Sequence, residues 1–273
     1  MQEQREKVKA FLSGDGIHLA PSCADAFDAA VIERLGFETL HLSGHAIHKS
    51  LCLPDAGLVT VSEFEARIRS IVEVVSLPLI VDGETGFGGV RNMRRTMRLL
   101  EPAGAAAIHF EDQITPRRFR TTGQSPIIPI AEMVAKLKAA LDERRDPNLV
   151  LIARCEERNS DSALIERLVT YAETGVDALW SSNFKPEVIR IVREQTRGIP
   201  FVGIAPNLHP AAAAGVRIAV YPTVGIIASA WGMTTVLTKL REGNAPEEIF
   251  RSLEGMDEVR TWFRDLGEAQ FAD

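Results

Sequence analysis

Short apolar runs rich in β-branched residues alternate with amphipathic stretches along most of this chain, and this alternation constrains the fold more than any other feature. The apolar runs are nearly continuous, as expected for parallel strands that are buried on both faces. We predict strands over Ile17–Ala20, Thr39–Leu42, Leu77–Asp82, Ala105–Glu111, Leu149–Arg154, Ala178–Ser181, Pro200–Ile204 and Val216–Tyr221. The helical patterns between them cover Ala24–Leu35, Ser62–Val75, Arg91–Glu101, Ile130–Arg144, Ser162–Thr174 and Pro186–Thr196. An alternation that recurs for all eight strands predicts an α/β fold of the (β/α)8 TIM-barrel type rather than an open doubly wound sheet.

Local signals mark the ends of several predicted helices. Thr60 and Glu63 have the spacing of a capping box, which opens a helix. Gly36, Gly104 and Gly175 each follow a helical pattern and precede a strand, where glycine accepts the left-handed conformation of a helix end. These signals agree with the periodicity and strengthen the barrel prediction.

The length of 273 residues suits one barrel, since such domains commonly run to about 250 residues. We therefore predict a single domain over residues 1–273. After the eighth strand, residues 224–273 carry further helical patterns over Gly225–Leu240, Ala245–Glu254 and Met256–Leu266. A barrel does not need these helices, so we expect the extension to lie at a subunit interface of a homo-oligomer, either a dimer or a tetramer.

Charge and composition exclude several classes of protein. The net charge of −6 disfavours binding to nucleic acid, and an anionic substrate must be met by local positive groups. We expect no membrane contact, because no run of about 18 apolar residues occurs and the charged first residues do not resemble a signal peptide. The three cysteines, Cys23, Cys52 and Cys155, lack the spacing of a zinc site or a disulfide framework, which favours a reduced, cytoplasmic protein.

Polar residues gather where the predicted strands end, which is the end of a (β/α)8 barrel that carries the chemistry. Asp82 and Glu84 follow the third strand, and Glu111 ends the fourth. On an extended strand end, residues two apart point to the same side. Like charges held this close require a cation between them, and Mg²⁺ prefers such hard oxygen ligands, with Mn²⁺ as an alternative. The competing interpretation is a surface turn with solvated charges.

Arg154 directly follows the apolar run of the fifth strand. Its planar guanidinium suits a substrate carboxylate or phosphonate, and a structural ion pair is the alternative. For Trp180 and Tyr221 we favour a role in the core, with a role in making the pocket more apolar as the alternative. For Cys155 we favour a packed small side chain over a nucleophile.

Taken together, these segments resemble the isocitrate lyase and phosphoenolpyruvate mutase superfamily. The resemblance extends over about residues 15–240 and is carried by Leu42–Gly44, Leu53–Gly57, Leu77–Gly88, Ala105–Gln113 and Ile152–Arg154. It implies making or breaking a C–C or P–C bond beside a 2-oxo acid, through an enolate that a metal stabilises.

The resemblance also implies roles for individual residues. Asp82, Glu84 and Glu111 would hold the metal, with Asp55 near its shell. Ser43 and the backbone of Gly44 and His45 would bind the 2-oxo acid or carboxylate end of the substrate. Arg154 would clamp a carboxylate. Arg154, Glu111 and His45 are the residues for which we predict catalytic roles.

This sequence differs from the family pattern at positions that bear on which reaction is catalysed. Isocitrate and methylisocitrate lyases carry a Lys-Lys/Arg-Cys-Gly-His stretch whose cysteine is the acid–base residue, whereas residues 114–124 here contain neither cysteine nor histidine. This argues against those two activities and makes His45 a candidate replacement, while His109 is expected to orient the site. Arg117, Arg118 and Arg120 in the same stretch are either anion contacts or part of a solvated loop. Glu84 replaces the usual aspartate of the metal motif and would shift the metal or contact it directly.

The sequence thus predicts a Mg²⁺-dependent carbon–carbon lyase acting on a small 2-hydroxy or 2-oxo di- or tricarboxylate. An oxaloacetate-type decarboxylase is the first alternative, because the decarboxylases of this superfamily also lack the acid–base cysteine of the Lys-Lys/Arg-Cys-Gly-His stretch. A P–C bond enzyme similar to phosphonopyruvate hydrolase or phosphoenolpyruvate mutase is the second. A barrel that binds a small acid without catalysis is the third.

Overall fold

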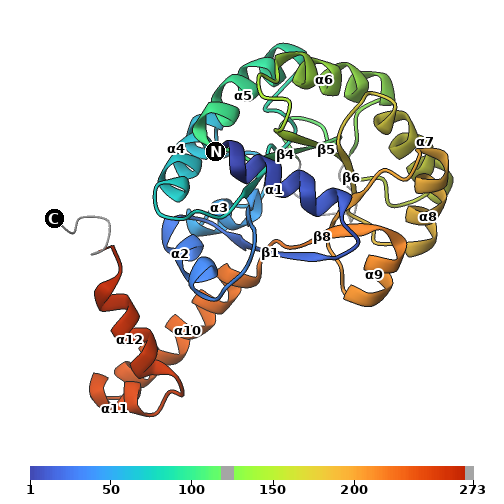
Figure 1. Cartoon of the computed structure of the whole chain (residues 1–273). Helices are drawn as coiled ribbons and strands as arrows, with labels where there is room; N and C mark the ends of the chain where they lie inside the picture. Colours follow the sequence, from blue (N-terminus) through green and yellow to red (C-terminus); the bar gives the residue numbers. More distant parts are fainter. Residues whose placement is uncertain (118–125, 268–273) are drawn as a thin grey trace. The chain divides into compact units, whose positions relative to one another are not determined.

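Eight parallel strands close into a barrel in the computed structural model, which describes residues 1–117 and 126–267 (Figure 1). Each strand pairs with the next along the chain, and β8 pairs with β1 to complete the ring. The strands are β1 His18–Cys23, β2 Leu40–Leu42, β3 Leu79–Asp82, β4 Ala107–Glu111, β5 Val150–Cys155, β6 Ala178–Ser181, β7 Phe201–Gly203 and β8 Val216–Tyr221. The predicted (β/α)8 architecture is confirmed, with every predicted strand in place.

Helices surround the barrel and follow its strands (Figure 1). Those of the barrel unit are α1 Gln2–Ser13, α2 Ala26–Arg34, α3 Gly44–Ser50, α4 Val61–Val72, α5 Val90–Ala103, α6 Ile130–Glu143, α7 Asp161–Ala172, α8 Pro186–Gln195 and α9 Leu208–Ala214. The predicted capping box is present, since the Thr60 and Glu63 side chains each bond the backbone N–H of the other. Helices α3 and α9 were not predicted, because seven residues are too few to show a helical period.

The core has two layers. The larger one lies between the strands and the outer helices. The smaller one fills the barrel interior, where side chains of several strands meet Val8 and Leu12 of α1. Helix α1 therefore closes the N-terminal end of the barrel, which we call the base (Figure 1).

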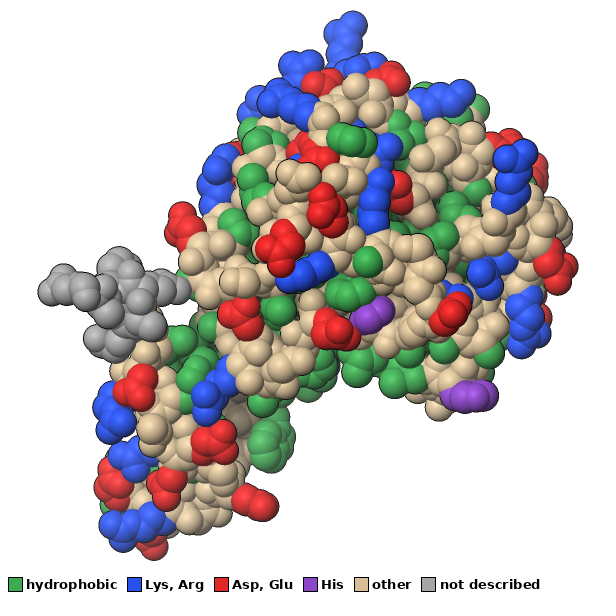
Figure 2. Space-filling model, in the orientation of Figure 1, with side chains coloured by type: hydrophobic (Ala, Val, Ile, Leu, Met, Phe, Trp, Pro, Cys, Tyr) green, Lys and Arg blue, Asp and Glu red, His purple; other side chains and the backbone are tan. Residues whose placement is uncertain are grey.

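Charged side chains at the base form ion pairs. Arg5 is 6% exposed, and its Nη1 lies 2.7 Å from Asp146 Oδ2. The same guanidinium donates to the carbonyls of Ala105 and Glu101 at 3.1 and 2.8 Å. Figure 2 shows basic and acidic side chains interspersed over this face.

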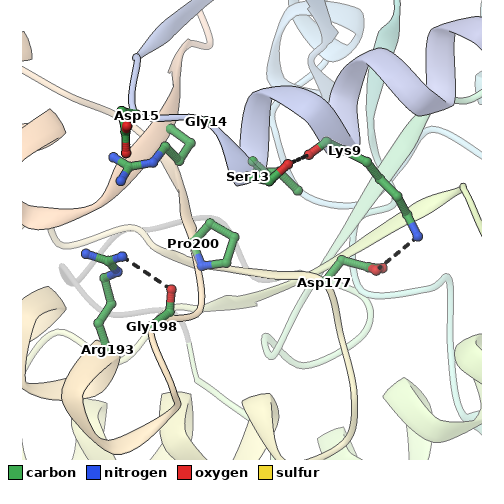
Figure 3. Close-up of a pocket in the computed structure, with 10 residues that line it drawn as sticks. Lys9, Ser13, Gly14, Asp15, Asp177, Arg193, Gly198 and Pro200 are labelled. Carbon is green, nitrogen blue, oxygen red and sulfur yellow. Dashed lines mark hydrogen bonds and ion pairs between the residues drawn. The ribbon is translucent and has the colours of Figure 1, made fainter.

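A cavity of about 550 Å³ also lies at the base, beside the C-terminal end of α1 (Figure 3). Lys9 Nζ there lies 3.9 Å from Asp177 Oδ1, and the other Asp177 oxygen lies 2.7 Å from Arg144 Nη1. Arg193 donates to the carbonyls of Gly198 and Ile199 beyond the end of α8. The charged groups of this cavity thus mainly tie neighbouring chain segments together.

Residues 225–273 form a second compact unit. Its helices are α10 Val224–Arg241, which begins at the unit boundary, α11 Pro246–Arg251 and α12 Met256–Asp265. Helix α10 has no buried residue and exposes Ile227, Trp231, Met233 and Leu237. The prediction of a single domain over the whole chain stays a prediction. No helix in the described ranges is both long and apolar enough to cross a membrane.

Candidate active site

A cavity of about 260 Å³ opens at the C-terminal ends of the strands, which we call the mouth. Five residues predicted from the sequence to form the site line it: Ser43, His45, Asp55, Asp82 and Arg154. The other lining residues are His41, Arg117, Trp180, Ile204, Pro222 and Thr223. The structure therefore brings together residues at or just after the ends of three different strands, as well as a residue of the loop after α3.

Asp82 and Glu84 lie close together, but not for the reason predicted. Asp82 ends β3, whereas Glu84 has a φ of 52°, so the chain turns between them instead of running extended. Asp82 Oδ1 accepts a hydrogen bond from the Glu84 N–H at 2.9 Å and fixes this turn. The prediction of an extended strand end was wrong, and a side-chain-capped turn brings the carboxylates together.

Gly44 gives these two carboxylates their space. A Cβ on Gly44 would lie 2.1 Å from Glu84 Oε1 and 3.0 Å from Asp82 Oδ2. The Gly44 N–H donates to Asp82 Oδ2 at 3.2 Å. This amide therefore helps to position the Asp82 carboxylate, and its predicted role in substrate binding stays a prediction.

Glu111 lies at the end of β4 and is fully buried. Its N–H donates to the Glu84 carbonyl at 2.9 Å, so the β3 turn and the β4 end are joined directly. Burial raises the pKa of Glu111 to about 8. Burial, together with the charges of Asp82 and Glu111, raises the pKa of Glu84 well above its ordinary value. These carboxylates are therefore costly to ionise in the absence of a cation.

Several carboxylate oxygens here have no hydrogen-bond partner within the described chain, namely Asp55 Oδ1, both oxygens of Glu84 and Glu111 Oε2. Buried oxygens of this kind need a partner, and hard oxygen donors suit Mg²⁺ or Mn²⁺. His48 lies beside Asp55 and Glu84, but both of its ring nitrogens bond backbone groups. The residues predicted to bind the metal thus fit a hard divalent cation.

Arg117 reaches into the same cluster and is 8% exposed. Its Nε lies 3.0 Å from Glu84 Oε2, and its Nη1 donates to Glu111 Oε1 at 3.1 Å. Its Nη2 contacts Asp55 Oδ1. The sequence pointed to Arg117 only as an anion contact in a loop, and these three carboxylate contacts were not predicted. Arg118 and Arg120 lie outside the described residues.

Arg154 is held from several sides at the wall of the cavity. Its Nη2 lies 2.6 Å from Glu156 Oε1 and its Nη1 3.4 Å from Glu111 Oε2. The guanidinium also stands over the Trp180 ring, 4.9 Å from its centroid. Burial favours the neutral form of Glu156, but Arg154, Ser182 and Arg158 outweigh it and lower the pKa of Glu156 to about 2. Arg154 is thus both a member of a structural ion pair and a fixed cation at the cavity wall.

His45 lies on α3 and faces Asp55, with 3.1 Å between its Nδ1 and Asp55 Oδ2. The Ser43 side chain accepts the Ala46 N–H and caps the same short helix. Burial, followed by the charges of Lys49 and Arg117, lowers the pKa of His45 below its ordinary value. A neutral imidazole therefore stands at the rim, held by a carboxylate.

A second pair of imidazoles lies deeper in the barrel. His41 Nε2 and His109 Nε2 are 2.9 Å apart, and His41 Nδ1 bonds the Ser22 hydroxyl at 2.8 Å. His109 Nδ1 lies 3.7 Å from Asp82 Oδ1. Burial lowers the pKa of both rings well below the ordinary value, so both are neutral. His109 thus lies close to the Asp82 carboxylate, and its predicted role in orienting the site stays a prediction.

Ser182 was missed in the sequence. It donates to Glu156 and also accepts from Arg154 Nε at 3.1 Å. Trp180 lines the cavity, with the Arg154 guanidinium over its ring, which is the pocket role weighed against a core role for this residue. Trp180 is also 1% exposed, so the predicted core role and a role in the site coincide. A polar triplet at the end of β6, Ser181-Ser182-Asn183, was the available signal.

The chain is similar to one known family and to several known enzymes over most of its length. A family model described as phosphoenolpyruvate phosphomutase matches residues 9–240. The chain is 34% identical to 2,3-dimethylmalate lyase of Eubacterium barkeri, over 93% of this chain and 95% of that protein. It is 35% identical to 2-methylisocitrate lyase of Aeropyrum pernix, over 92% and 82% of the two chains. It is 34% identical to oxaloacetate decarboxylase of Rhodopseudomonas palustris, over 91% and 88%.

Solved structures of proteins from the same superfamily superpose on this chain. A phosphonopyruvate hydrolase in complex with oxalate and Mg²⁺ superposes with a TM-score of 0.83 at 26% identity, over 99% of both chains. A 2,3-dimethylmalate lyase structure superposes with a TM-score of 0.83 at 22% identity, over 98% of this chain and 95% of that one, and supports the fold.

Proposed function

Because this chain belongs to the phosphoenolpyruvate mutase and isocitrate lyase superfamily, we propose that it is a Mg²⁺-dependent carbon–carbon lyase. Its substrate would be a small 2-hydroxy or 2-oxo di- or tricarboxylate. The observation that carries this proposal is the cluster of four carboxylates at the mouth, those of Asp55, Asp82, Glu84 and Glu111, beside the fixed cation Arg154. Asp55, Asp82 and Arg154 of this cluster line the cavity, and the other two carboxylates are buried beside them.

Asp82, Glu84 and Glu111 would hold the cation, with Asp55 beside it. When bound, Mg²⁺ would stabilise the negative charge that develops on the oxygen of the 2-oxo acid. The same ion would offset the burial and the repulsion between carboxylates that raise the pKa of Glu84 and Glu111. Mn²⁺ suits the same oxygen ligands and serves as an alternative.

Arg154 would bind a substrate carboxylate. Its contacts with Glu156 and Trp180 fix the guanidinium before substrate arrives, so little side-chain entropy is lost on binding. The Ser43 side chain also lines the cavity and would contact the same substrate. A cavity of about 260 Å³ favours an acid of few carbons.

His45 is our choice for the proton transfer. Asp55 can only accept a hydrogen bond, so the Nδ1–H of a neutral His45 donates to it and the Nε2 lone pair stays available. With a 2-hydroxy acid, this nitrogen would take the hydroxyl proton as the C–C bond breaks. The electrons of the broken bond pass to the second product, onto the carbon next to its carboxylate group. That carbon then takes up a proton. His45 can supply this proton, which closes the cycle without another donor.

Oxaloacetate decarboxylation is the second candidate. Three features favour it: the cysteine-free stretch over residues 114–124, the decarboxylase relatives at 34% identity, and a small cavity. Loss of CO₂ from a 2-oxo acid produces the same kind of enolate, and the same residues would stabilise it.

The test is NMR detection of products from oxaloacetate, dimethylmalate, methylisocitrate and phosphonopyruvate, each with Mg²⁺ and with EDTA. Metal-dependent pyruvate together with a second carboxylic acid would support the lyase. Pyruvate with CO₂ would favour the decarboxylase, and pyruvate with phosphate the P–C reaction. Tight binding of these acids without turnover of any would support a non-catalytic acid-binding barrel.

For the assembly, we propose that a second copy of the chain covers the apolar side chains of α10, giving a dimer or tetramer. Trp231 and Met233 are 70% and 63% exposed, which is unusual for such large apolar side chains. Light scattering of the wild type and of Trp231→Glu tests this, with a shift to monomer expected in the variant. A cytoplasmic location stays a prediction, consistent with the unpaired state of Cys23, Cys52 and Cys155.

A further inference from the structure

We infer that Arg117 competes with the divalent cation for the same carboxylates, so that this arginine balances the charge of the metal-free site and must withdraw before the ion can bind. The inference rests on the proposed metal site and concerns how tightly that site takes up its ion. It does not depend on which acid is the substrate.

The contacts of Arg117 carry the inference. Its guanidinium contacts Glu84, Glu111 and Asp55, which come from the β3 turn, the end of β4 and the loop after α3. Two of these residues belong to the predicted metal-binding set, and the third lies beside it. The side chain is 8% exposed, so it is inserted among the carboxylates and does not lie over them. An ion bound to the same oxygens would occupy the space of the guanidinium.

Arg117 neutralises these carboxylates without saturating their oxygens. Of its three carboxylate contacts, the one from Nη1 to Glu111 Oε1 is an aligned hydrogen bond, at 3.1 Å. Glu84 Oε1 and Oε2, Glu111 Oε2 and Asp55 Oδ1 have no hydrogen-bond partner within the described ranges. A planar fork matches one carboxylate at a time, whereas a divalent cation accepts oxygens from several directions. The ion is therefore the better partner for the cluster, and Arg117 is the one that can be displaced.

Two local features place Arg117 there. Glu84 is one methylene longer than aspartate, and its Oε2 meets Arg117 Nε at 3.0 Å. Gly57 leaves room for the Arg117 backbone, since a Cβ at this glycine would lie 3.1 Å from the Arg117 nitrogen. The φ of Gly57 is 68°, which other residues rarely adopt.

Competition has a reciprocal consequence. If Arg117 stabilises the metal-free carboxylates, its removal must tighten ion binding by the same free energy by which it destabilises the metal-free protein. The usual range of such couplings leads us to expect roughly tenfold tighter binding.

The experiment is a Mn²⁺ titration followed by electron paramagnetic resonance of the free ion, with no substrate present. The wild type is compared with Arg117→Gln and with Arg117→Lys, which keeps the charge but loses the planar fork. Arg98→Gln is the control, because it removes one positive charge from a side chain that is 61% exposed and paired with Glu143 on the barrel exterior. We expect Arg117→Gln to bind Mn²⁺ roughly tenfold more tightly, Arg117→Lys to be intermediate and Arg98→Gln to match the wild type.

Thermal unfolding supplies a second measurement. Without metal, Arg117→Gln should unfold at a lower temperature than the wild type, and saturating Mn²⁺ should remove the difference. Unchanged or weaker Mn²⁺ binding in a folded Arg117→Gln would overturn the inference while leaving the metal site in place. If Arg117→Gln does not fold, Arg117→Lys decides by the same criterion. Absence of Mn²⁺ binding in every protein, the wild type included, would overturn the proposed metal site and this inference together.

Discussion

The base and the mouth of this barrel treat buried charge in opposite ways. At the base, Arg5 faces Asp146 at 2.7 Å, and Arg144 faces Asp177 at the same distance. At the mouth, Glu84 and Glu111 lie close together, and their burial raises the pKa of both carboxyl groups. The base has the larger cavity, about 550 Å³ against about 260 Å³. Cavity size therefore does not single out the proposed active site of this barrel, whereas the crowding of buried like charges does.

The difference follows from what each end must do. Paired charges at the base stabilise the junction between α1 and the strands whether or not a ligand is present. At the mouth, Arg117 and Arg154 offset only part of the charge of the crowded carboxylates, and a divalent cation would offset the rest. Four experiments would test or sharpen this contrast, in order of decreasing expected effect.

Asp82→Ala should give the largest change. The variant loses a carboxylate of the metal-binding set that also accepts the Gly44 and Glu84 amides, so we expect turnover to fall by roughly 10³-fold. Steady-state assays with the active substrate and saturating Mg²⁺ measure this. Full retained activity would refute the metal assignment.

Arg5→Met is the counterpart at the base. Removing the cation leaves Glu101 and Asp146 without their buried partner, which should lower the free energy of unfolding by about 3–5 kcal/mol. Urea unfolding measures the loss. The turnover number per folded molecule should not change, and a specific loss of turnover would show that the two ends are not independent.

His45→Ala should lower turnover by roughly 10²-fold, the usual contribution of a general acid–base group. His109→Ala should reduce turnover less but lower the unfolding temperature more, because His109 is fully buried and bonded to His41. Both variants are compared at saturating substrate. Equal effects on turnover would remove His45 from the proposed role.

The smallest effect concerns pH. Glu111 has its pKa raised to about 8, so the metal-free folded state keeps a proton that the unfolded chain releases near pH 4.5. Stability from this group is present below about pH 4.5 and is lost as the pH rises towards 8. Asp146 at the base has its pKa lowered through its bond to Arg5, so its contribution is lost only in acid.

We therefore expect the unfolding temperature of the metal-free protein to fall by several degrees between about pH 5 and pH 8. Excess Mg²⁺ and, separately, Glu111→Gln should each flatten this dependence. If the unfolding temperature of the metal-free protein stayed constant or rose over the same pH range, the proposed crowding of buried carboxylates at the mouth would be contradicted.

The barrel could be predicted because the sequence signals of its strands and helices lie within short segments of the chain. Each strand is an apolar run bounded by turn signals, and each long helix shows its own period. The approach of Asp82, Glu84, Glu111 and Arg154 followed from the rule that parallel strands present their C-terminal ends together. Other parts of the site depend on contacts that no local pattern encodes. The turn at Glu84 is held by the Asp82 side chain, and the partners of Arg117 come from three separate segments.

The pairing of β8 with β1 has a consequence for biosynthesis. His18 lies beside Ile218 in the finished barrel, although roughly 200 residues separate them. At ordinary translation rates, the first strand emerges about 10–40 s before its last neighbour exists. Throughout that interval one edge of β1 is unpaired, and the apolar residues of α1 that fill the barrel interior have no completed ring to enter. Of the eight strands, β1 therefore waits longest during synthesis for a neighbour that completes its pairing in the barrel.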